Sequence, residues 1–295
     1  MPIVPIYLYG TYSLPQVGDG AIYHYTKYDI FLKILDSMSL KSSQLCRMND
    51  LNEADLSNLD WTRDFLSMYN AQSYVQTQCS IISFSQNYEV EEVCREGSNH
   101  PAMWAHYAED SNGVCIAFDK NELIKINEDR LKHIFYKFEE VDYTWSHNPE
   151  VKITREDYSS VSEFIQDNYK ELFYKKDLDW SNEGEVRFFA ETPQLELCII
   201  GAIKHVVLGK KLIEDKKKMR ELISKVTSPE SVYAGYFSLH SFATIIKSIG
   251  GYQVVDASHH IKHYLDEMVD EGLIQSHELN NNWKTDSFVT FNREC

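Results

Sequence analysis

The sequence predicts an α+β fold, because strand patterns and helix patterns follow one another along the chain without strict alternation. Short runs rich in β-branched and aromatic residues predict strands, and runs with apolar residues three or four apart predict helices. The chain has 295 residues, of which 43% are hydrophobic, and this is enough for a large packed core. No internal repeat or low-complexity tract interrupts it.

Residues 101–119 carry the clearest combination of a helix and a strand. Pro101 suits the first position of a helix, and Ala102–Glu109 contains no Gly or Pro. The apolar run Val114–Phe118 is typical of a buried strand. The helix also brings together three side chains with polar-tipped rings, namely Trp104, His106 and Tyr107. These rings suit contact with a ligand, and two core aromatics beside a surface histidine are the alternative.

The remaining elements of the core follow from the same two periodicities. We expect strands at Ala21–Tyr25, Ser39–Leu45, Cys79–Ser85, Ile134–Tyr143, Glu185–Ala190 and Ala202–Leu208. We expect helices at Tyr28–Met38, Asp55–Tyr74, Lys120–Ile126, Ser160–Tyr174 and Glu214–Val226. Residues 1–19 read as an extended lead-in, residues 20–235 as the core, and residues 89–99 as a loop.

Residues 236–295 are predicted to form a small helical, winged-helix-like appendage. Phe237–Ile249 and Ala257–Glu271 have helical periodicity, and Gln275–Leu279 with Ser287–Phe291 suggest a hairpin. The segment contains four Lys or Arg against eight Asp or Glu, a net charge of −4. A DNA-reading winged helix usually has a basic face, so this charge favours a protein partner or a dimer.

Composition narrows the classes of function. The net charge of −16 opposes non-specific binding to a phosphate backbone, although a local basic groove remains compatible with it. The six cysteines form no CxxC pair and no metal-ligand spacing, so we expect reduced thiols, no metal and a cytoplasmic location. No apolar run approaches the ~18 residues of a membrane-spanning helix. A secretory signal is also not apparent in the first ten residues.

Three groups of residues are candidates for chemistry. His24 and Tyr25 lie at a strand end, where they suit a ribose hydroxyl and a flat ring, or simply an edge strand. Glu185 and Arg187 would share one face of a strand, so the arginine favours the ionised carboxylate; a solvated salt bridge is the alternative. The third group is polar and suits either ligand contacts or a helix cap: Asn49, Asp50 and Glu53.

Several short motifs, taken in order, resemble the "domain of unknown function 2971" family. The central segment supplies the Met-Trp, His-Tyr-Ala and Gly-Val-Cys-Ile pieces, ending in Phe-Asp. The other pieces are Ile22–Tyr25, Asn49-Asp50 with Glu53, Ser83–Ser85, Val141 with Tyr143, Trp180 with Glu183–Arg187, and Val206–Gly209. This resemblance spans most of residues 20–226. The chain departs from it at Leu51, where the family usually has Pro, and at His24, where many members have Lys.

The order His24, Tyr107, Glu185 also resembles the three-part pattern of the ADP-ribosyltransferase superfamily, and the opening IYHYTKYDIFLKIL resembles its DNA-modifying toxin branch. This resemblance implies a split antiparallel sheet, NAD as a substrate and no metal. Together with the candidate groups above, it leads us to expect catalytic roles for Glu185, Arg187 and Tyr107. We also expect contacts with NAD for His24, Tyr25, Asn49, Asp50, Ser85, Trp104, His106 and Glu183.

The resulting expectation is an NAD-dependent transfer of ADP-ribose to a macromolecular acceptor, nucleic acid or protein, in a toxin or phage-defence setting. Two alternatives stay open. One is an inactive nucleotide- or protein-binding sensor or adaptor, since fold does not imply function. The other is plain NAD hydrolysis without an acceptor. The sequence predicts no membrane partner.

Overall fold

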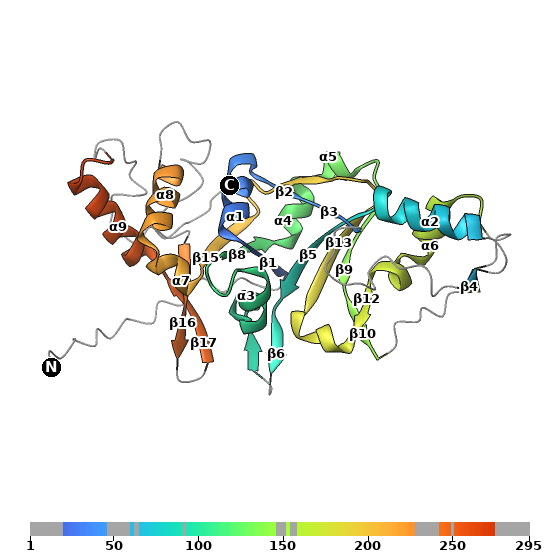
Figure 1. Ribbon diagram of the computed structural model, residues 1–295, viewed down its shortest axis with the longest axis horizontal. Helices are drawn as coiled ribbons and strands as arrows, with labels where there is room; N and C mark the ends of the chain where they lie inside the picture. Colours follow the sequence, from blue (N-terminus) through green and yellow to red (C-terminus); the bar gives the residue numbers. More distant parts are fainter. Residues whose placement is uncertain are drawn as a thin grey trace.

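The computed structural model describes residues 20–45, 60–61, 65–90, 93–145, 152–153, 158–227, 242–248 and 251–274. Its centre is a nine-stranded mixed sheet (Figure 1). In spatial order, eight of the strands are β17 (Gly251–Asp256), β16 (Phe242–Ser248), β15 (Ile203–Leu208), β8 (Val114–Asp119), β1 (Ala21–Thr26), β5 (Ser80–Gln86), β13 (Glu185–Ala190) and β9 (Tyr136–Glu140). The ninth, β3 (Ser43–Gln44), also pairs with β5. Neighbouring strands are antiparallel except β15 and β16, which are parallel.

Helices cover one face of this sheet, and the largest apolar core lies between these helices and the sheet. Alternate strand residues such as Ile22, Phe84 and Phe188 point into it. The helices around this core are α1 (Tyr28–Ser37), α4 (Lys120–Lys125), α5 (Glu128–Leu131), α7 (Lys210–Glu214), α8 (Lys216–Thr227) and α9 (Ser258–Asp270). Figure 1 shows α8 and α9 at the end of the molecule that carries β16 and β17.

The opposite face carries two separate apolar clusters. The α3 cluster forms where α3 (Pro101–Tyr107) covers β1, β8 and β15, and it includes Tyr23. The α6 cluster forms where α2 (Phe65–Gln78) and α6 (Val161–Phe173) cover β5 and β13, and it includes Ile81. Because strand side chains alternate, Ser83 and Ser85 lie on this same face. Polar side chains therefore occupy the sheet surface between the two clusters.

The pairing between β1 and β5 is short. Only Ile22 and Tyr23 of β1 pair with β5, opposite Gln86 and Ser85, whereas β1 pairs with β8 along its whole length. Further along β5, its partner on that side is β3, which pairs at Ile81 and Ser80. The strand pairing along this side of β5 is thus interrupted between β1 and β3.

Four two-stranded sheets lie outside the main sheet. They are β2 (Ser39–Lys41) with β14 (Glu196–Cys198), β10 (Asp142–Thr144) with β12 (Lys175–Asp177), β6 (Tyr88–Val90) with β7 (Val93–Arg95), and β4 (Asp60–Trp61) with β11 (Lys152–Ile153). The 3-10 turn η2 (Gly97–Asn99) lies between β7 and α3, and η4 (Leu178–Glu183) lies between β12 and β13. The parallel pair β10–β12 places Lys176 opposite Tyr143 and leads directly into η4.

The predicted α+β class is confirmed at the level of a mixed sheet with several helices. The predicted strand Glu185–Ala190 and the helix Ser160–Tyr174 are found within one residue of their expected bounds. The loop prediction for residues 89–99 is wrong in part, since β6, β7 and η2 lie there. Residues 1–19 and the predicted hairpin strands Gln275–Leu279 and Ser287–Phe291 lie outside the described residues.

The prediction of a helix at Phe237–Ile249 is wrong over residues 242–248, which form β16. This strand lies between β15 and β17, and its apolar run fits a strand with neighbours on both sides. Periodicity alone does not separate such a run from a buried helix. The β16–β17 pair extends the main sheet, and α9 packs on the same core as α8. Residues 242–248 and 251–270 are therefore continuous with the core in the described structure.

Candidate functional site

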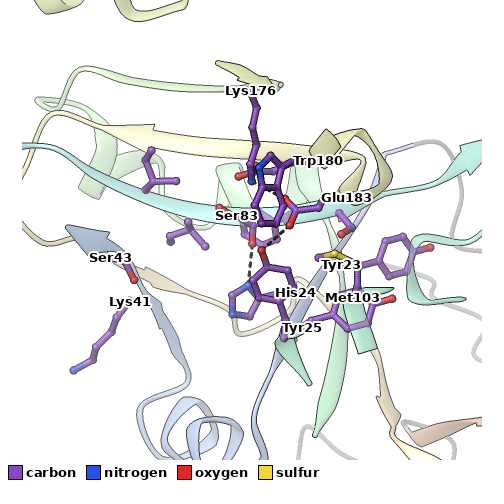
Figure 2. A pocket seen from close by; sticks show the side chains of 16 residues that line it. Tyr23, His24, Tyr25, Lys41, Ser43, Ser83, Met103, Lys176, Trp180 and Glu183 are labelled. Atoms are coloured by element: carbon purple, nitrogen blue, oxygen red, sulfur yellow. Dashed lines mark hydrogen bonds and ion pairs between the residues drawn. The ribbon is translucent and has the colours of Figure 1, made fainter. Parts of the chain in front are cut away.

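The pocket lies on the face between the α3 cluster and the α6 cluster, next to the interruption between β1 and β5 (Figure 2). Its volume is about 240 Å³. The sheet lines its floor with residues from β1, β5 and β13, while α3, β12 and η4 supply its walls. The lining residues are Tyr23, His24, Tyr25, Lys41, Ser43, Ile81, Ile82, Ser83, Phe84, Ser85, Met103, Tyr107, Lys176, Trp180, Glu183 and Glu185.

His24 bridges the interruption in the sheet. Its Nδ1 lies 3.0 Å from the backbone oxygen of Ser83 on β5, and its ring packs edge-on against Phe84. A carbonyl only accepts, so Nδ1 carries the proton and Nε2 is the acceptor nitrogen of the neutral ring. Burial lowers the pKa of His24 below its usual value, although the Ser83 carbonyl acts in the opposite direction. At neutral pH His24 thus offers the pocket an uncharged acceptor.

Glu185 is held as an anion by Arg187, two residues along β13. Arg187 Nε donates to Oε1 at 2.7 Å, and a terminal nitrogen donates to Oε2 at 2.8 Å. Burial raises the pKa of Glu185, but Arg187, Lys176 and the Ser83 hydroxyl outweigh burial and lower that pKa to about 2. The expected same-face pair is present. It is buried rather than solvated, because α6 covers it and Phe173 accepts a further Arg187 hydrogen bond.

A second carboxylate stands beside the first. Glu183 ends η4, and Gly184 adopts a left-handed conformation with φ of 50° that joins η4 to β13. The Tyr107 hydroxyl donates to Glu183 Oε1 at 2.6 Å, and Lys176 Nζ donates to Oε2 at 2.7 Å. Lys176 Nζ is also 3.4 Å from Glu185 Oε2. Tyr107, Lys176 and the two carboxylates thus form one continuous network on the wall of the pocket.

Lys176 and Trp180 form the outer part of this wall. The Lys176 side chain is only 7% exposed, and its Nζ lies 4.8 Å from the centre of the Trp180 ring. Trp180 itself is 39% exposed and lines the pocket at its rim. Lys176 was not among the sequence-based candidates. A single lysine in a charged stretch has no spacing that distinguishes it, and only the β10–β12 pairing brings it here.

Ser85 has a hydroxyl that no described residue satisfies. Ser85 is 1% exposed and lines the pocket, and its Oγ has no hydrogen-bond partner in the described structure. A buried hydroxyl without a partner costs free energy, on the order of 1–3 kcal/mol. A polar group of a bound molecule or a water molecule would satisfy it, so the Ser85 hydroxyl is available to whatever occupies the pocket.

The other predicted site residues have different surroundings. Tyr25 lines the pocket, but its hydroxyl donates to the Gly97 oxygen at 2.6 Å. Trp104 is 2% exposed, donates to the Ser98 oxygen, and packs against Tyr25. His106 is exposed on α3, and neither it nor Trp104 lines the pocket. Two further candidates, Asn49 and Asp50, lie outside the described residues.

Among the residues that the structure describes, no group of three or more His, Cys, Asp or Glu side chains is arranged to hold a metal ion. None of the helices in the described ranges is long and apolar enough to cross a membrane.

Comparison with known proteins gives a partial match. The model of the family described as "Protein of unknown function (DUF2971)" matches residues 103–188. This supports the predicted resemblance to that family over part of its expected span, and the matched segment includes Tyr107, Lys176, Glu183 and Glu185. His24 on β1 lies before it. No curated protein and no solved structure matches the chain.

Proposed function

We propose that this protein is an NAD-dependent ADP-ribosyltransferase that transfers ADP-ribose to a macromolecular acceptor. One observation carries the proposal: His24, Tyr107 and Glu185, from three distant parts of the chain, line the same pocket. Scattered side chains would have removed the basis of the resemblance to that superfamily. The interruption between β1 and β5 also agrees with the split sheet that the resemblance implies.

His24 is suited to hold a ribose of NAD. Its Nδ1 is engaged by the Ser83 carbonyl, so the neutral ring presents Nε2 as an acceptor. A sugar hydroxyl is a donor of the right kind. The ring orientation is also fixed on both sides, by the Ser83 oxygen and by the edge contact with Phe84.

Glu185 is suited to stabilise positive charge. Cleavage of the bond between nicotinamide and ribose passes through an oxocarbenium-like state, as in glycoside hydrolysis. A carboxylate that is already ionised and immobile stabilises such a state without reorganising. Arg187 keeps Glu185 in that condition. Tyr107 then supplies an aromatic ring beside the carboxylate pair, with its hydroxyl fixed by Glu183.

The size of the pocket and the Ser85 hydroxyl bear on which part of NAD it would hold. Ser85 offers a buried hydroxyl that a polar group of the substrate would satisfy. The volume of about 240 Å³ lies just below the range of roughly 300–1,000 Å³ that is common for ligand pockets. We therefore expect the pocket to hold the reacting end of the dinucleotide, with the remainder extending toward its other lining residues, Lys41 and Ser43.

The acceptor and the setting rest on the resemblance alone. It suggests a nucleic acid or a protein as acceptor, and a toxin or phage-defence role. Plain NAD hydrolysis uses the same pocket residues with water as acceptor, so it is separated from transfer only by assay.

One observation favours a second function, a nucleotide- or protein-binding sensor or adaptor without catalysis. Both oxygens of Glu185 are already engaged by Arg187, and Lys176 and Ser83 also interact with this carboxylate. A carboxylate with this many partners is suited to a structural role as well as to catalysis. Ligand binding without cleavage would support this alternative.

The experiment is nicotinamide release from NAD, with and without a cell extract that supplies acceptors. Glu185→Gln keeps the shape but loses the charge, and we expect the rate to fall by about 10²–10³. Glu128→Gln on exposed α5 is the matched control and should retain the wild-type rate. Full release by the Glu185 variant would place the chemistry elsewhere. Binding of NAD without release in any condition would favour the sensor or adaptor.

A further inference from the structure

Lys176 stands between the two carboxylates of the pocket wall. Its Nζ is 2.7 Å from Glu183 Oε2 and 3.4 Å from Glu185 Oε2, and all three side chains are buried. We infer that Lys176 is a positioning residue, whose charge holds the carboxylates of Glu183 and Glu185 together on one wall of the pocket. Its effect on catalysis rests on the proposed function, whereas its effect on the carboxylates does not.

The need for this cation follows from the local chain. Glu183 and Glu185 are separated by Gly184 alone, and two buried carboxylates that approach one another disfavour joint ionisation. Arg187 uses its guanidinium on both oxygens of Glu185 and on the Phe173 carbonyl. Lys176 is the cation that reaches Glu183 in the described structure, and Tyr107 adds only an uncharged donor.

The ammonium group is held in place from several directions. The β10–β12 pairing sets the Lys176 backbone opposite Tyr143, whose hydroxyl accepts the backbone N–H of Glu185. The Trp180 ring lies 4.8 Å from Nζ, a distance at which its face attracts a cation. Lys176 therefore connects β12, η4 and β13 through its side chain.

Other titratable groups face this cluster from every element packed against it. They are Arg187 on β13, Tyr143 on β10, Tyr107 on α3, His100 just before α3, and His24 on β1. Burial keeps His24 and His100 neutral at pH 7, because it lowers the pKa of each. Arg187 and Lys176 are thus the cations that face the two carboxylates at neutral pH among the described residues.

The first test removes the charge of Lys176 but keeps the aliphatic part of its side chain. Lys176→Met removes the ammonium but retains the aliphatic stem, and Lys175→Met, which loses an ion pair with Glu171 instead, is the matched control. The carboxyl carbon of Glu185 is followed by NMR against pH and assigned with Glu185→Gln. In Lys176→Met we expect Glu185 to take up its proton at a higher pH than in the wild type, because Lys176 lowers the pKa of Glu185. The control and Lys176→Arg should titrate as the wild type does.

An unchanged titration in folded Lys176→Met would overturn the inference. If that variant does not fold, the inference is tested on the wild-type protein. Its Lys176 Nζ hydrogens should exchange with solvent slowly enough for detection by ¹⁵N NMR. Fast exchange, no slower than that of the half-buried Lys175, would also overturn it.

Nicotinamide release is scored separately. If the wild type releases nicotinamide, Lys176→Met should lose activity at a higher pH than the wild type as the solution is acidified, and Lys176→Arg should restore the profile. If the wild type releases none, the proposed function fails, while the titration still decides the role of Lys176.

Discussion

The buried pair of Arg187 and Glu185 allows a quantitative test of what stabilises this part of the pocket. Arg187→Met removes the guanidinium and leaves the Glu185 carboxylate with Lys176 as its nearest cation, 3.4 Å away. Both members of the pair are nearly inaccessible, with Arg187 1% and Glu185 4% exposed. Water therefore replaces the lost partner poorly, and the substitution should lower the free energy of unfolding substantially.

Two estimates of the magnitude agree. Arg187, Lys176 and Ser83 together lower the pKa of Glu185 from 4.5 to about 2 against the effect of burial, and at 1.36 kcal/mol per pH unit this net shift corresponds to roughly 3 kcal/mol. Removing one partner of a buried pair typically costs about 3–5 kcal/mol. The contribution is present above the ordinary pKa of the carboxyl group and is lost as pH falls through about 2. At pH 7 the full effect should appear.

Chemical denaturation at pH 7 measures this loss, with Glu185→Gln and the double variant completing a cycle. The double variant should recover most of the stability, because replacing both members of a buried pair is often close to neutral. The reasoning would be refuted by a loss below about 1 kcal/mol in Arg187→Met. It would also be refuted by single-variant losses that simply add in the double variant.

Two further predictions concern the core. Burial lowers the pKa of His205 on β15 to about 4, so the unfolded state binds more protons between about pH 6.5 and 4. Stability should therefore fall by roughly 3 kcal/mol as pH decreases through that interval, and His205→Leu should remove this part of the pH dependence of urea unfolding. Gly113→Ala should cost at least about 2 kcal/mol, because the new methyl would lie in contact with the Thr26 oxygen and the Ala108 backbone. In Gly272→Ala the new methyl meets no neighbour, and only the positive φ of 72° disfavours alanine. Thermal melting should therefore show a smaller loss of stability, about 1 kcal/mol.

The sequence predicts the elements whose pattern is local. The strand β13 and the helix α6 appear as expected, because a run of apolar residues or a helical stripe is visible within one window. The helix α9 is found within one residue of its predicted bounds for the same reason. The strand β16 was predicted as a helix, because its identity depends on β15 and β17 as neighbours, and no local window contains both.

Within the pocket, the sequence indicates residues that belong to short recognisable motifs. His24, Tyr107 and Glu185 are of this kind, and the structure brings all three to one pocket. Trp104 comes from the same motif as Tyr107, but it faces the α3 cluster and bonds to the Ser98 oxygen. Met103 and Tyr107, four residues apart on α3, share the side that lines the pocket, whereas Trp104, adjacent to Met103, does not line it. Membership of a motif therefore does not establish contact with a ligand.

The position of the pocket depends on a feature that no motif expresses, the early end of the β1–β5 ladder. After Tyr23, β1 continues its pairing with β8 but not with β5, and the Ser83 carbonyl needs another donor. His24 supplies that donor from its side chain, which fixes the ring and its tautomer in one contact. Lys in place of His24 would put a flexible cation at this gap. A lysine has three donors and no acceptor, so it would donate to a ligand where neutral His24 accepts. The neutral acceptor that we assign to His24 therefore depends on the histidine and on the interrupted sheet that fixes its ring.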